Sequence, residues 1–267
     1  MCGIVGIWRR DGAPIDQSQP RAMTDRLVHR GPDDEGYWPK PGVALGHRRL
    51  SIIDLAGSRQ PMSAGVTHVC FNGEIFNYAE LRSEIRGRYA FRTQGDTEVL
   101  LALYQLEGTD GVHRLDGQFA YAIVDEERDE LWLFRDRIGI LPLYYYWDGD
   151  LLLFASEIKA ILPALPRPVE VDEQSVKEYL AYRSVPPPHT LFKGIRKLPP
   201  GHRICLTRTG GLRIEAYWTL PTAPPEDSIS DAEAIELTGA ALDRAVRTRL
   251  VADVPVAAYL SGGAAST

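Results

Sequence analysis

The sequence is poor in cysteine, and its few thiols follow no pattern that binds a metal or builds a disulfide framework. The three cysteines stand at positions 2, 70 and 205, with no CxxC pair among them. The six histidines likewise lack the short paired spacings of metal-binding motifs. The sequence therefore predicts no protein metal site, and the thiols of Cys70 and Cys205, which lie in apolar runs, are expected in the core.

The chain also lacks a basic stretch and a long apolar run. Its 30 basic and 36 acidic residues are interspersed and give a formal net charge of -6, so no surface for nucleic acid or anionic lipid is predicted. No run approaches the ~20 apolar residues that span a bilayer, and the start has neither the basic nor the long apolar segment of a signal peptide. We therefore expect a cytoplasmic protein without nucleic-acid or membrane partners.

Apolar residues make up 44% of the 267 residues, and they fall in short runs that are typical of strands. Strands are predicted at residues 3–8, 43–47, 67–71, 118–125, 130–135, 143–147, 151–155, 203–207 and 212–218. Helices are predicted at residues 22–29, 78–86, 97–106 and 157–162, with Asn77 and Asp96 as caps and Gly108 as a stop. Turn-rich links favour antiparallel pairing, so the pattern is α+β, with an irregular proline-rich stretch between residues 163 and 202.

The composition changes after residue 220. Residues 221–229 are rich in proline and read as a linker. Ser230 to Glu233 form a capping box before a helix with one apolar face. A buried strand is then expected from Val254 to Leu260, before a glycine loop. We therefore divide the chain into a domain at 1–220, a linker at 221–229 and the truncated start of a second domain at 230–267.

The start of the chain, MCGIVG, places a thiol directly behind the initiator methionine. Removal of that methionine would leave Cys2 with its thiol and a free α-amine on the same residue. An amine with a pKa near ~8 can serve as a base for the thiol, so Cys2 is a candidate nucleophile. The alternative is that Cys2 is only a small residue that permits trimming.

Two further pairs of residues are candidates for a site. Asn72 and Gly73 follow a predicted strand, where a turn would let a side-chain amide and a backbone N–H point at one oxygen and form an oxyanion hole. Arg49 and Asp96 could bind the carboxylate and the ammonium of a free amino acid. The alternatives are an ordinary Asn-Gly turn, a solvated arginine and a helix cap.

The order of the motifs resembles the glutaminase domain of glutamine-hydrolysing asparagine synthetases, which are class II (N-terminal nucleophile) glutamine amidotransferases. The resemblance is carried by MCGIVG, HRGPDDEG, HRRLSIID, NGEIFN, GDTEV, RDRIGILPLYY, ASEIKAI and FKGIRKLPPGH. VPVAAYLSGG resembles the entry to the ATP-binding synthetase domain of the same enzymes. The resemblance covers nearly the whole chain.

This resemblance implies a four-layer αββα sandwich of two antiparallel sheets, of the Ntn-hydrolase type, followed by a short fragment of an α/β PP-loop domain. It implies that Cys2 attacks the amide of L-glutamine, that Asn72 and Gly73 hold the oxyanion, and that Arg49 and Asp96 grip the amino acid. Arg30 and Gly31 would flank the nucleophile. The other substrate-binding positions that it implies are Leu50, Ser51, Ile52, Ile53 and Glu74. The products would be glutamate and ammonia, and this step needs no cofactor.

The glycine loop departs from the family pattern SGGxDS, because Ala265 stands where the family has an aspartate that helps to hold the magnesium of ATP. The resemblance implies nucleotide contacts at Leu260, Ser261, Gly262, Gly263 and Ser266. Without the carboxylate at position 265, we expect ATP and Mg to be bound poorly by this chain alone.

Three hypotheses therefore stand. The first is a glutaminase that supplies ammonia to a synthetase domain, in the same polypeptide or in another, with a homodimer as a possible assembly. The second is an N-terminal nucleophile amidase that acts on another amide, and Arg49 and Asp96 argue against it. The third is a non-catalytic regulatory or interaction module, for which Ala265 is the only support.

Overall fold

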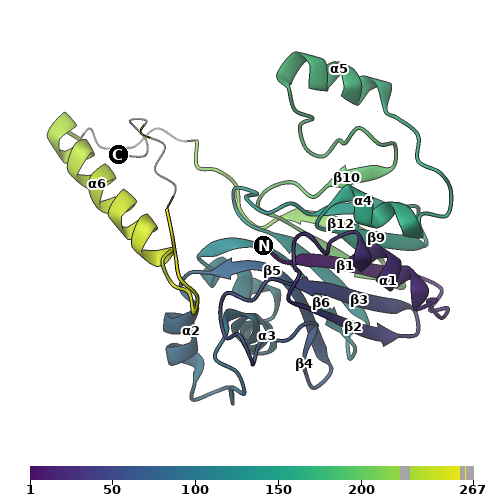
Figure 1. Ribbon diagram of the computed structural model, residues 1–267, viewed down its shortest axis with the longest axis horizontal. Coiled ribbons are helices and arrows are strands. Elements are labelled where there is room, and N and C mark those ends of the chain that lie inside the picture. Colours follow the sequence, from purple (N-terminus) through teal and green to yellow (C-terminus); the bar gives the residue numbers. More distant parts are fainter. Residues whose placement is uncertain (223–228, 259–261, 263–267) are drawn as a thin grey trace.

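The computed structural model describes residues 1–222, 229–258 and 262 (Figure 1). Two six-stranded antiparallel sheets form its centre. The strand order of the first sheet is β10 (Ile195–Lys197), β8 (Tyr144–Trp147), β9 (Leu151–Ala155), β1 (Gly3–Arg9), β3 (Val43–Arg49) and β2 (Asp34–Lys40). The order of the second is β12 (Gly211–Ala216), β11 (His202–Thr207), β7 (Glu130–Arg135), β6 (Gly117–Asp125), β5 (Thr67–Ile75) and β4 (Met62–Ala64).

Helices cover the outer faces of both sheets, so the order of layers is αββα. Helices α1 (Ser18–Asp25) and α4 (Ile158–Ile161) pack with the first sheet, and α2 (Tyr78–Ile85) and α3 (Asp96–Glu107) pack with the second. Two short 3₁₀ helices, Gly108–Arg114 and Leu162–Ala164, follow α3 and α4. The predicted α+β sandwich of two antiparallel sheets is therefore confirmed.

The alternation of side chains along each strand explains the layers. In β1, Ile4 and Trp8 lie in the core between the sheets, whereas Val5 and Ile7 face α1 and α4. Full burial of a large apolar side chain is worth about 1.5–3 kcal/mol, so a strand with two apolar faces is stable only between two layers. The predicted burial of Cys70 and Cys205 is also confirmed.

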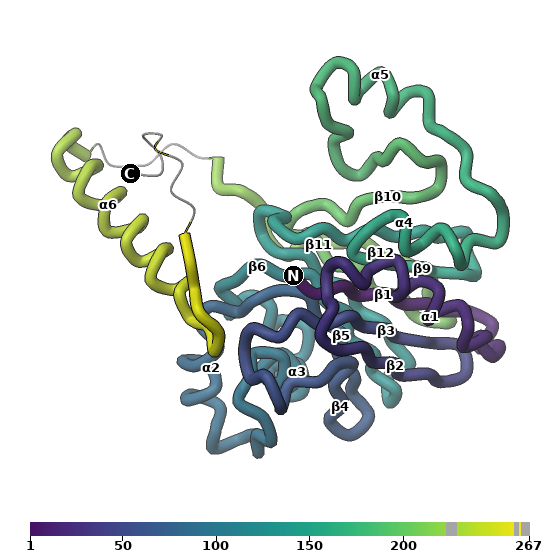
Figure 2. The backbone as a smooth tube through the Cα atoms, viewed as in Figure 1, coloured from purple at the N-terminus to yellow at the C-terminus, as the bar shows by residue number. Residues whose placement is uncertain are grey.

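Every predicted strand within residues 1–218 is present, but the sequence pattern missed β2, β4 and β10. These are short or lie at sheet edges, and β2 contains Pro39, which edge strands tolerate because they need fewer backbone donors. Helix α1 begins and ends four residues before the predicted 22–29. Helix α5 (Glu173–Tyr182) lies in the stretch expected to be irregular, where the Asp172 carboxylate caps it, and it stands away from the sheets (Figure 2).

The region behind residue 229 differs from the prediction in one respect. Helix α6 (Asp231–Thr248) is present and Ser230 caps it by accepting from the N–H of Glu233 (3.3 Å). The strand expected at Val254 to Leu260 is absent from its described part, residues 254–258, most of which is exposed. A strand needs a partner strand for its backbone groups, and none of the described segments pairs with it. Residues 259 and 260 of the predicted strand lie outside the described residues.

Candidate active site

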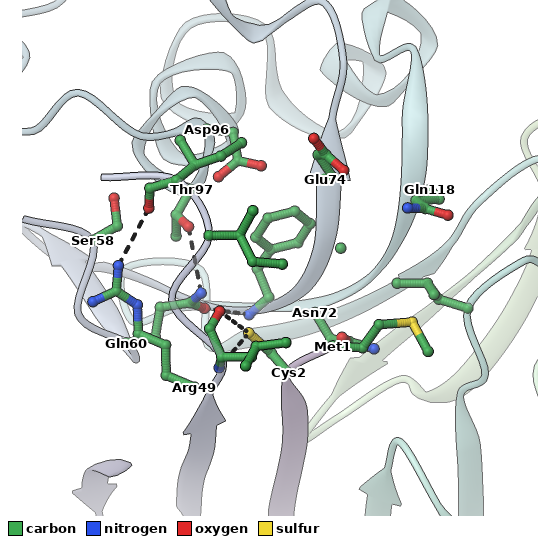
Figure 3. A pocket seen from close by; sticks show the side chains of 16 residues that line it. Met1, Cys2, Arg49, Ser58, Gln60, Asn72, Glu74, Asp96, Thr97 and Gln118 are labelled. Carbon is green, nitrogen blue, oxygen red and sulfur yellow. Dashed lines mark hydrogen bonds between the residues drawn. The ribbon is translucent and has the colours of Figure 1, made fainter. Parts of the chain in front are cut away.

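A pocket opens where β1, β3, β5 and the start of α3 meet (Figure 3). It holds about 630 Å³ of free space including its open mouth, which suits a small metabolite. Of the residues singled out in the sequence, most line it: Cys2, Arg49, Leu50, Ile52, Ile53, Asn72, Gly73, Glu74 and Asp96. Residues as distant in sequence as Cys2 and Asp96 therefore share one cavity.

Cys2 lies immediately before β1 and contacts the end of β3. Its Sγ accepts from the N–H of Leu50 (3.4 Å) and faces the Leu50 carbonyl oxygen at 3.6 Å. Burial raises the pKa of the Cys2 thiol, although the Leu50 backbone opposes this rise. The thiol is therefore neutral near pH 7 and needs a base to become a nucleophile. Burial also lowers the pKa of the α-amine at Met1, which favours its neutral form.

Three of the singled-out residues do not line the pocket. The Arg30 Nε donates to the carbonyl oxygen of Cys2 (2.8 Å), so Arg30 stands behind the nucleophile. Gly31 packs on β3, where an added Cβ would lie 2.3 Å from the Arg48 carbonyl carbon. The N–H of Ser51 donates to the Asp33 carboxylate (2.8 Å). Arg30 and Gly31 therefore support the site from outside the pocket.

Asn72 and Gly73 lie inside β5, opposite Ala120 and Phe119 of β6, so the expected turn is wrong. The strand continues because its pairing with β6 extends to Ile75. The Asn72 side chain is fully buried, and neither its amide nitrogen nor its oxygen has a partner among the described residues. An unpaired buried amide costs about 1–3 kcal/mol, so this arrangement points to a bound ligand rather than to stability.

The backbone N–H of Gly73 faces the same edge of β5 as two neighbours with partners. The N–H of Phe71 donates to the Gln60 side chain (2.6 Å), and that of Ile75 donates to the Asp96 carboxylate (3.1 Å). Successive N–H groups of a strand alternate in direction, so the N–H of Gly73 points between these two acceptors. Only glycine fits there, because a Cβ would lie 2.3 Å from the Gln118 carbonyl oxygen.

Arg49 ends β3, and its guanidinium is almost fully buried beside the pocket. It donates to the carbonyl oxygens of Ile53 (3.3 Å), Asp54 (2.7 Å) and Leu55 (3.0 Å). These contacts hold the guanidinium in place and use only part of its five N–H donors. A fixed positive charge at the wall of a pocket can bind a carboxylate.

Asp96 is the first residue of α3 and not the cap that the sequence predicted, because Gly95 precedes the helix as its N-cap. Burial raises the pKa of Asp96 to about 7, and the nearby Glu74 adds to the rise. Burial also raises the pKa of Glu74. A nearby positive charge would stabilise the ionised form of both carboxyl groups. This side of the pocket is therefore suited to an ammonium group.

The pocket also contains residues that sequence reasoning missed: Ser58, Gln60, Phe71, Thr97, Gln118 and Leu141. Gln60 accepts from Phe71 of β5 and donates to the Thr97 hydroxyl of α3 (3.4 Å), so it fixes two walls of the pocket. Gln60 lies in the long loop between β3 and β4, where no periodicity marks a functional residue. Only the fold could reveal it.

Most of the predicted nucleotide loop, Leu260, Ser261, Gly263 and Ser266, lies outside the described residues. Gly262 is exposed, with φ at 75°. Among the described residues, no group of three or more His, Cys, Asp or Glu side chains is arranged to hold a metal ion. None of the described helices combines the length and the apolar character that crossing a membrane requires.

Comparison with known proteins gives two family matches. Residues 1–218 match the family described as "Glutamine amidotransferase domain", and residues 238–267 match "Asparagine synthase". Similar curated proteins include asparagine synthetase [glutamine-hydrolyzing] 3 of Bacillus subtilis, which is 39% identical over 98% of this chain and 44% of its own length. Amidase chry2 of Gibberella zeae is 38% identical over 98% of this chain and 41% of its own length. This chain therefore spans about half of such relatives or less.

A solved structure has the same fold. The glutamine phosphoribosylpyrophosphate amidotransferase from B. subtilis superposes with a TM-score of 0.60, over 82% of this chain and 50% of that chain, at 21% sequence identity. At this identity, the likeness shows the fold alone.

Proposed function

The chain belongs to the family of glutamine amidotransferase domains, and from this premise we propose that it hydrolyses L-glutamine to glutamate and ammonia. The family match also bears out the resemblance that the sequence motifs carried. The observation that supports the activity most is the meeting of Cys2, Arg49, Asp96 and the unpartnered Asn72 amide in one pocket. A thiol, two charges of opposite sign and free donors are the groups that amide hydrolysis of an amino acid requires.

Binding comes first. The guanidinium of Arg49 holds the α-carboxylate of glutamine, and the carboxyl group of Asp96 holds its α-ammonium. Asp96 is ionised in this complex, because the positive charge of the ligand counters the burial that raises its pKa. With both charged ends held, the side-chain amide of glutamine reaches the thiol of Cys2.

The chemical step needs the α-amine of Cys2, which is free only after Met1 has been removed. This amine takes the thiol proton, and Sγ attacks the side-chain amide carbon of glutamine. The oxygen of that amide becomes an oxyanion, which accepts hydrogen bonds from the Asn72 amide and the Gly73 N–H. Collapse of the intermediate breaks the C–N bond, and the leaving nitrogen takes the proton from the amine and departs as ammonia.

A thioester between Cys2 and the glutamyl group remains. Water attacks its carbonyl carbon with the amine as base, and the same two donors again hold the oxyanion. The C–S bond breaks, the thiol regains its proton, and glutamate leaves. One water is consumed, and no redox partner is needed.

The ammonia feeds an ATP-dependent amidation of the asparagine-synthetase type, in the same polypeptide or in a partner. The match of residues 238–267 to "Asparagine synthase" supports this use, as does the name of the B. subtilis relative. ATP and Mg would be cofactors of that step only. The divisions 1–220, 221–229 and 230–267, the cytoplasmic location and the homodimer stay predictions.

The test is a glutaminase assay on the purified chain, with intact mass to determine whether Met1 is absent. Cys2→Ala removes the nucleophile, so we expect turnover to fall by at least about a thousandfold with no change in unfolding temperature. Cys70→Ala is the control, because this buried thiol lies in the core rather than the pocket. Full activity in Cys2→Ala, or in protein that retains Met1, contradicts the mechanism.

The name of the G. zeae relative favours a second candidate, hydrolysis of another amide. The same assay with amides that lack the α-carboxylate or the α-amine separates the two. Turnover of those amides at the rate of glutamine would contradict a role for Arg49 and Asp96.

A further inference from the structure

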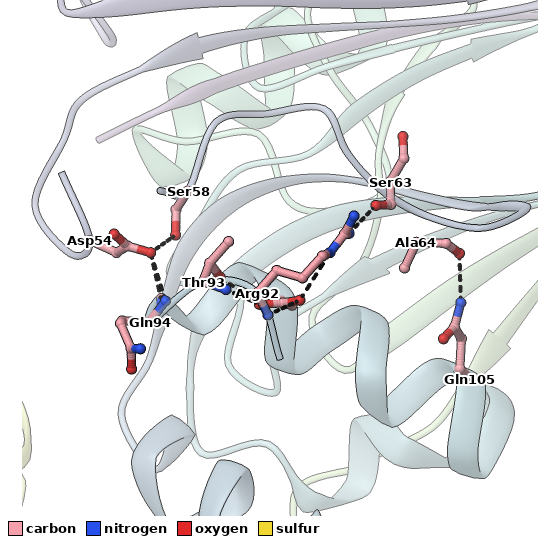
Figure 4. Close-up of polar contacts among 10 residues, drawn as sticks. Asp54, Ser58, Ser63, Ala64, Arg92, Thr93, Gln94 and Gln105 are labelled. Carbon is pink, nitrogen blue, oxygen red and sulfur yellow. Dashed lines mark hydrogen bonds and ion pairs between the residues drawn. The ribbon is translucent and has the colours of Figure 1, made fainter. Parts of the chain in front are cut away.

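Asp54, in the loop between β3 and β4, binds the backbone of the residues that directly precede α3 in sequence. Its carboxylate accepts from the N–H groups of Gln94 (2.8 Å) and Gly95 (3.2 Å), and the contacts with Ser58 and Gln94 are drawn in Figure 4. Gly95 is the N-cap of α3 and directly precedes Asp96. Burial opposes ionisation of this carboxyl group, but the N–H donors hold the pKa of Asp54 below its usual value.

The backbone of the same residue holds the other charged group of the pocket. The carbonyl oxygen of Asp54 accepts from the Arg49 guanidinium at 2.7 Å. The side chain of Asp54 thus holds the backbone that precedes Asp96, and its carbonyl oxygen holds Arg49. Among the described residues, only Asp54 makes hydrogen bonds to both Arg49 and the N-cap of α3.

Asp54 adopts an unusual conformation, with φ at 49°. A residue other than glycine is rarely left-handed, and it stays so only where its surroundings hold it. The side chain supplies part of this restraint, because it also accepts from the N–H of Gly57 (3.0 Å). The rest comes from a distant part of the chain.

Asp253, which follows α6, makes two hydrogen bonds to the Ile52–Asp54 backbone. Its carboxylate accepts from the N–H of Asp54 (2.7 Å), and its own N–H donates to the carbonyl oxygen of Ile52 (2.9 Å). Ile52 lines the pocket. The same segment is anchored by Arg249, whose guanidinium lies 4.4 Å from the centre of the Phe76 ring, one residue beyond the end of β5. Figure 1 shows α6 descending toward α2 and the chain after it turning upward again near that helix.

We propose that Asp54 is a positioning residue that sets the spacing of Arg49 and Asp96, and that Asp253 holds it in place from the segment behind α6. The proposal rests on the proposed function, because it assigns these two groups to the ends of glutamine. The affinity of the pocket for glutamine then depends on how Asp253, in the region that matches "Asparagine synthase", contacts the Ile52–Asp54 loop.

The expected kinetic signature is a change in binding rather than in chemistry. Neither Asp54 nor Asp253 contacts Cys2 or Asn72, so the transition-state groups stay in place when these carboxylates are changed. Loss of the Asp253 carboxylate leaves the Asp54 N–H without its acceptor and lets the loop move with the carbonyl oxygens that hold Arg49. The result is a raised KM for glutamine at an unchanged kcat.

Three variants at two positions test this. Asp253→Ala removes the acceptor and should raise KM about fivefold, whereas Asp253→Asn keeps an acceptor oxygen and should stay within about twofold of wild type. Asp54→Asn should raise KM about tenfold, since asparagine tolerates the left-handed conformation but presents one acceptor oxygen instead of two. The matched control is Asp243→Ala on exposed α6, whose carboxylate pairs, among the described residues, only with Arg247 (2.7 Å).

Hydrogen exchange of the amides of residues 51–58 gives a readout that does not depend on turnover. Faster exchange in Asp253→Ala than in Asp243→Ala supports the proposal. Equal exchange together with an unchanged KM overturns it, and so does an equal loss of kcat and of stability in both variants. A wild-type chain that does not hydrolyse glutamine refutes the proposed function instead, and the exchange comparison then still decides whether Asp253 holds the loop.

Discussion

Helices α3 and α6 are the two longest helices in the part of the chain that the structure describes, and they differ sharply in what surrounds them. Helix α3 buries each of its residues from Asp96 to Tyr104, against β5 and α2. Helix α6 has no buried residue among the parts of the chain that the structure describes, although its sequence has an apolar face with Ile235, Leu242 and Val246. The helix with the amphipathic pattern is the exposed one.

An apolar stripe therefore shows what a helix is able to bury, and not what it buries in the folded chain. Helix α3 sits in a layered core because β5 supplies an apolar surface directly beneath it. Helix α6 meets the rest of the molecule mainly through the segment that follows it, which contacts the Ile52–Asp54 loop and Phe76. Stability should therefore depend on α3, while α6 can act on the pocket without being part of the core.

The largest effect is expected for Leu101→Ala in α3. Leu101 is 0% exposed, and its truncation leaves a cavity in a packed core, which costs about 3 kcal/mol. Urea unfolding followed by circular dichroism measures this loss. A cost below about 1 kcal/mol would mean that α3 is not the packed helix that its burial indicates.

Asn72→Ala, in the strand beneath α3, should separate activity from stability. We expect kcat to fall by roughly a hundredfold, because the amide donates to charge that develops in the transition state. The unfolding temperature should stay level or rise, because the variant removes a buried amide without partners. Steady-state kinetics beside a thermal melt provide both values. A change in KM alone would contradict the oxyanion role of Asn72.

The first residue of α3 predicts that stability depends on pH. The pKa of Asp96 is about 7 in the folded chain and near its ordinary 3.8 when unfolded, so the folded state binds the proton more tightly between these values. Its contribution to stability is complete below about pH 4 and is lost as the pH rises through 7. The urea midpoint should therefore fall more between pH 5 and pH 8 in wild type than in Asp96→Asn. Equal falls would show that Asp96 is ionised throughout.

The smallest effect is expected for Leu242→Ala in α6, which is the counterpart of the substitution in α3. Leu242 is 62% exposed, so its loss should change the free energy of unfolding by less than about 0.5 kcal/mol. The same urea titration applies. A loss comparable with that of Leu101→Ala would show that the apolar face of α6 is packed in solution.

Much of the sandwich could be predicted because its strands are long, apolar and joined in sequence. The runs at 118–125 and 130–135 became β6 and β7, paired as a hairpin. The edge strands β2 and β4 could not be predicted, since a strand covered on few sides needs no strong apolar pattern. The site could be predicted only in part. The chemistry of Cys2, Arg49 and Asp96 singles them out, and their catalytic roles stay predictions. Gln60 and Asp54 act through contacts that no local sequence pattern indicates.

Local periodicity and the order of motifs were enough to predict the α+β class, the family and the residue types available for chemistry. Three features could be seen only in three dimensions: Asn72 and Gly73 continue a strand, the apolar stripe of α6 is exposed, and Asp253 binds Asp54. These are pairings between segments as many as 199 residues apart. Their free energy depends on which surfaces meet in three dimensions, and the local pattern around each residue does not contain that information.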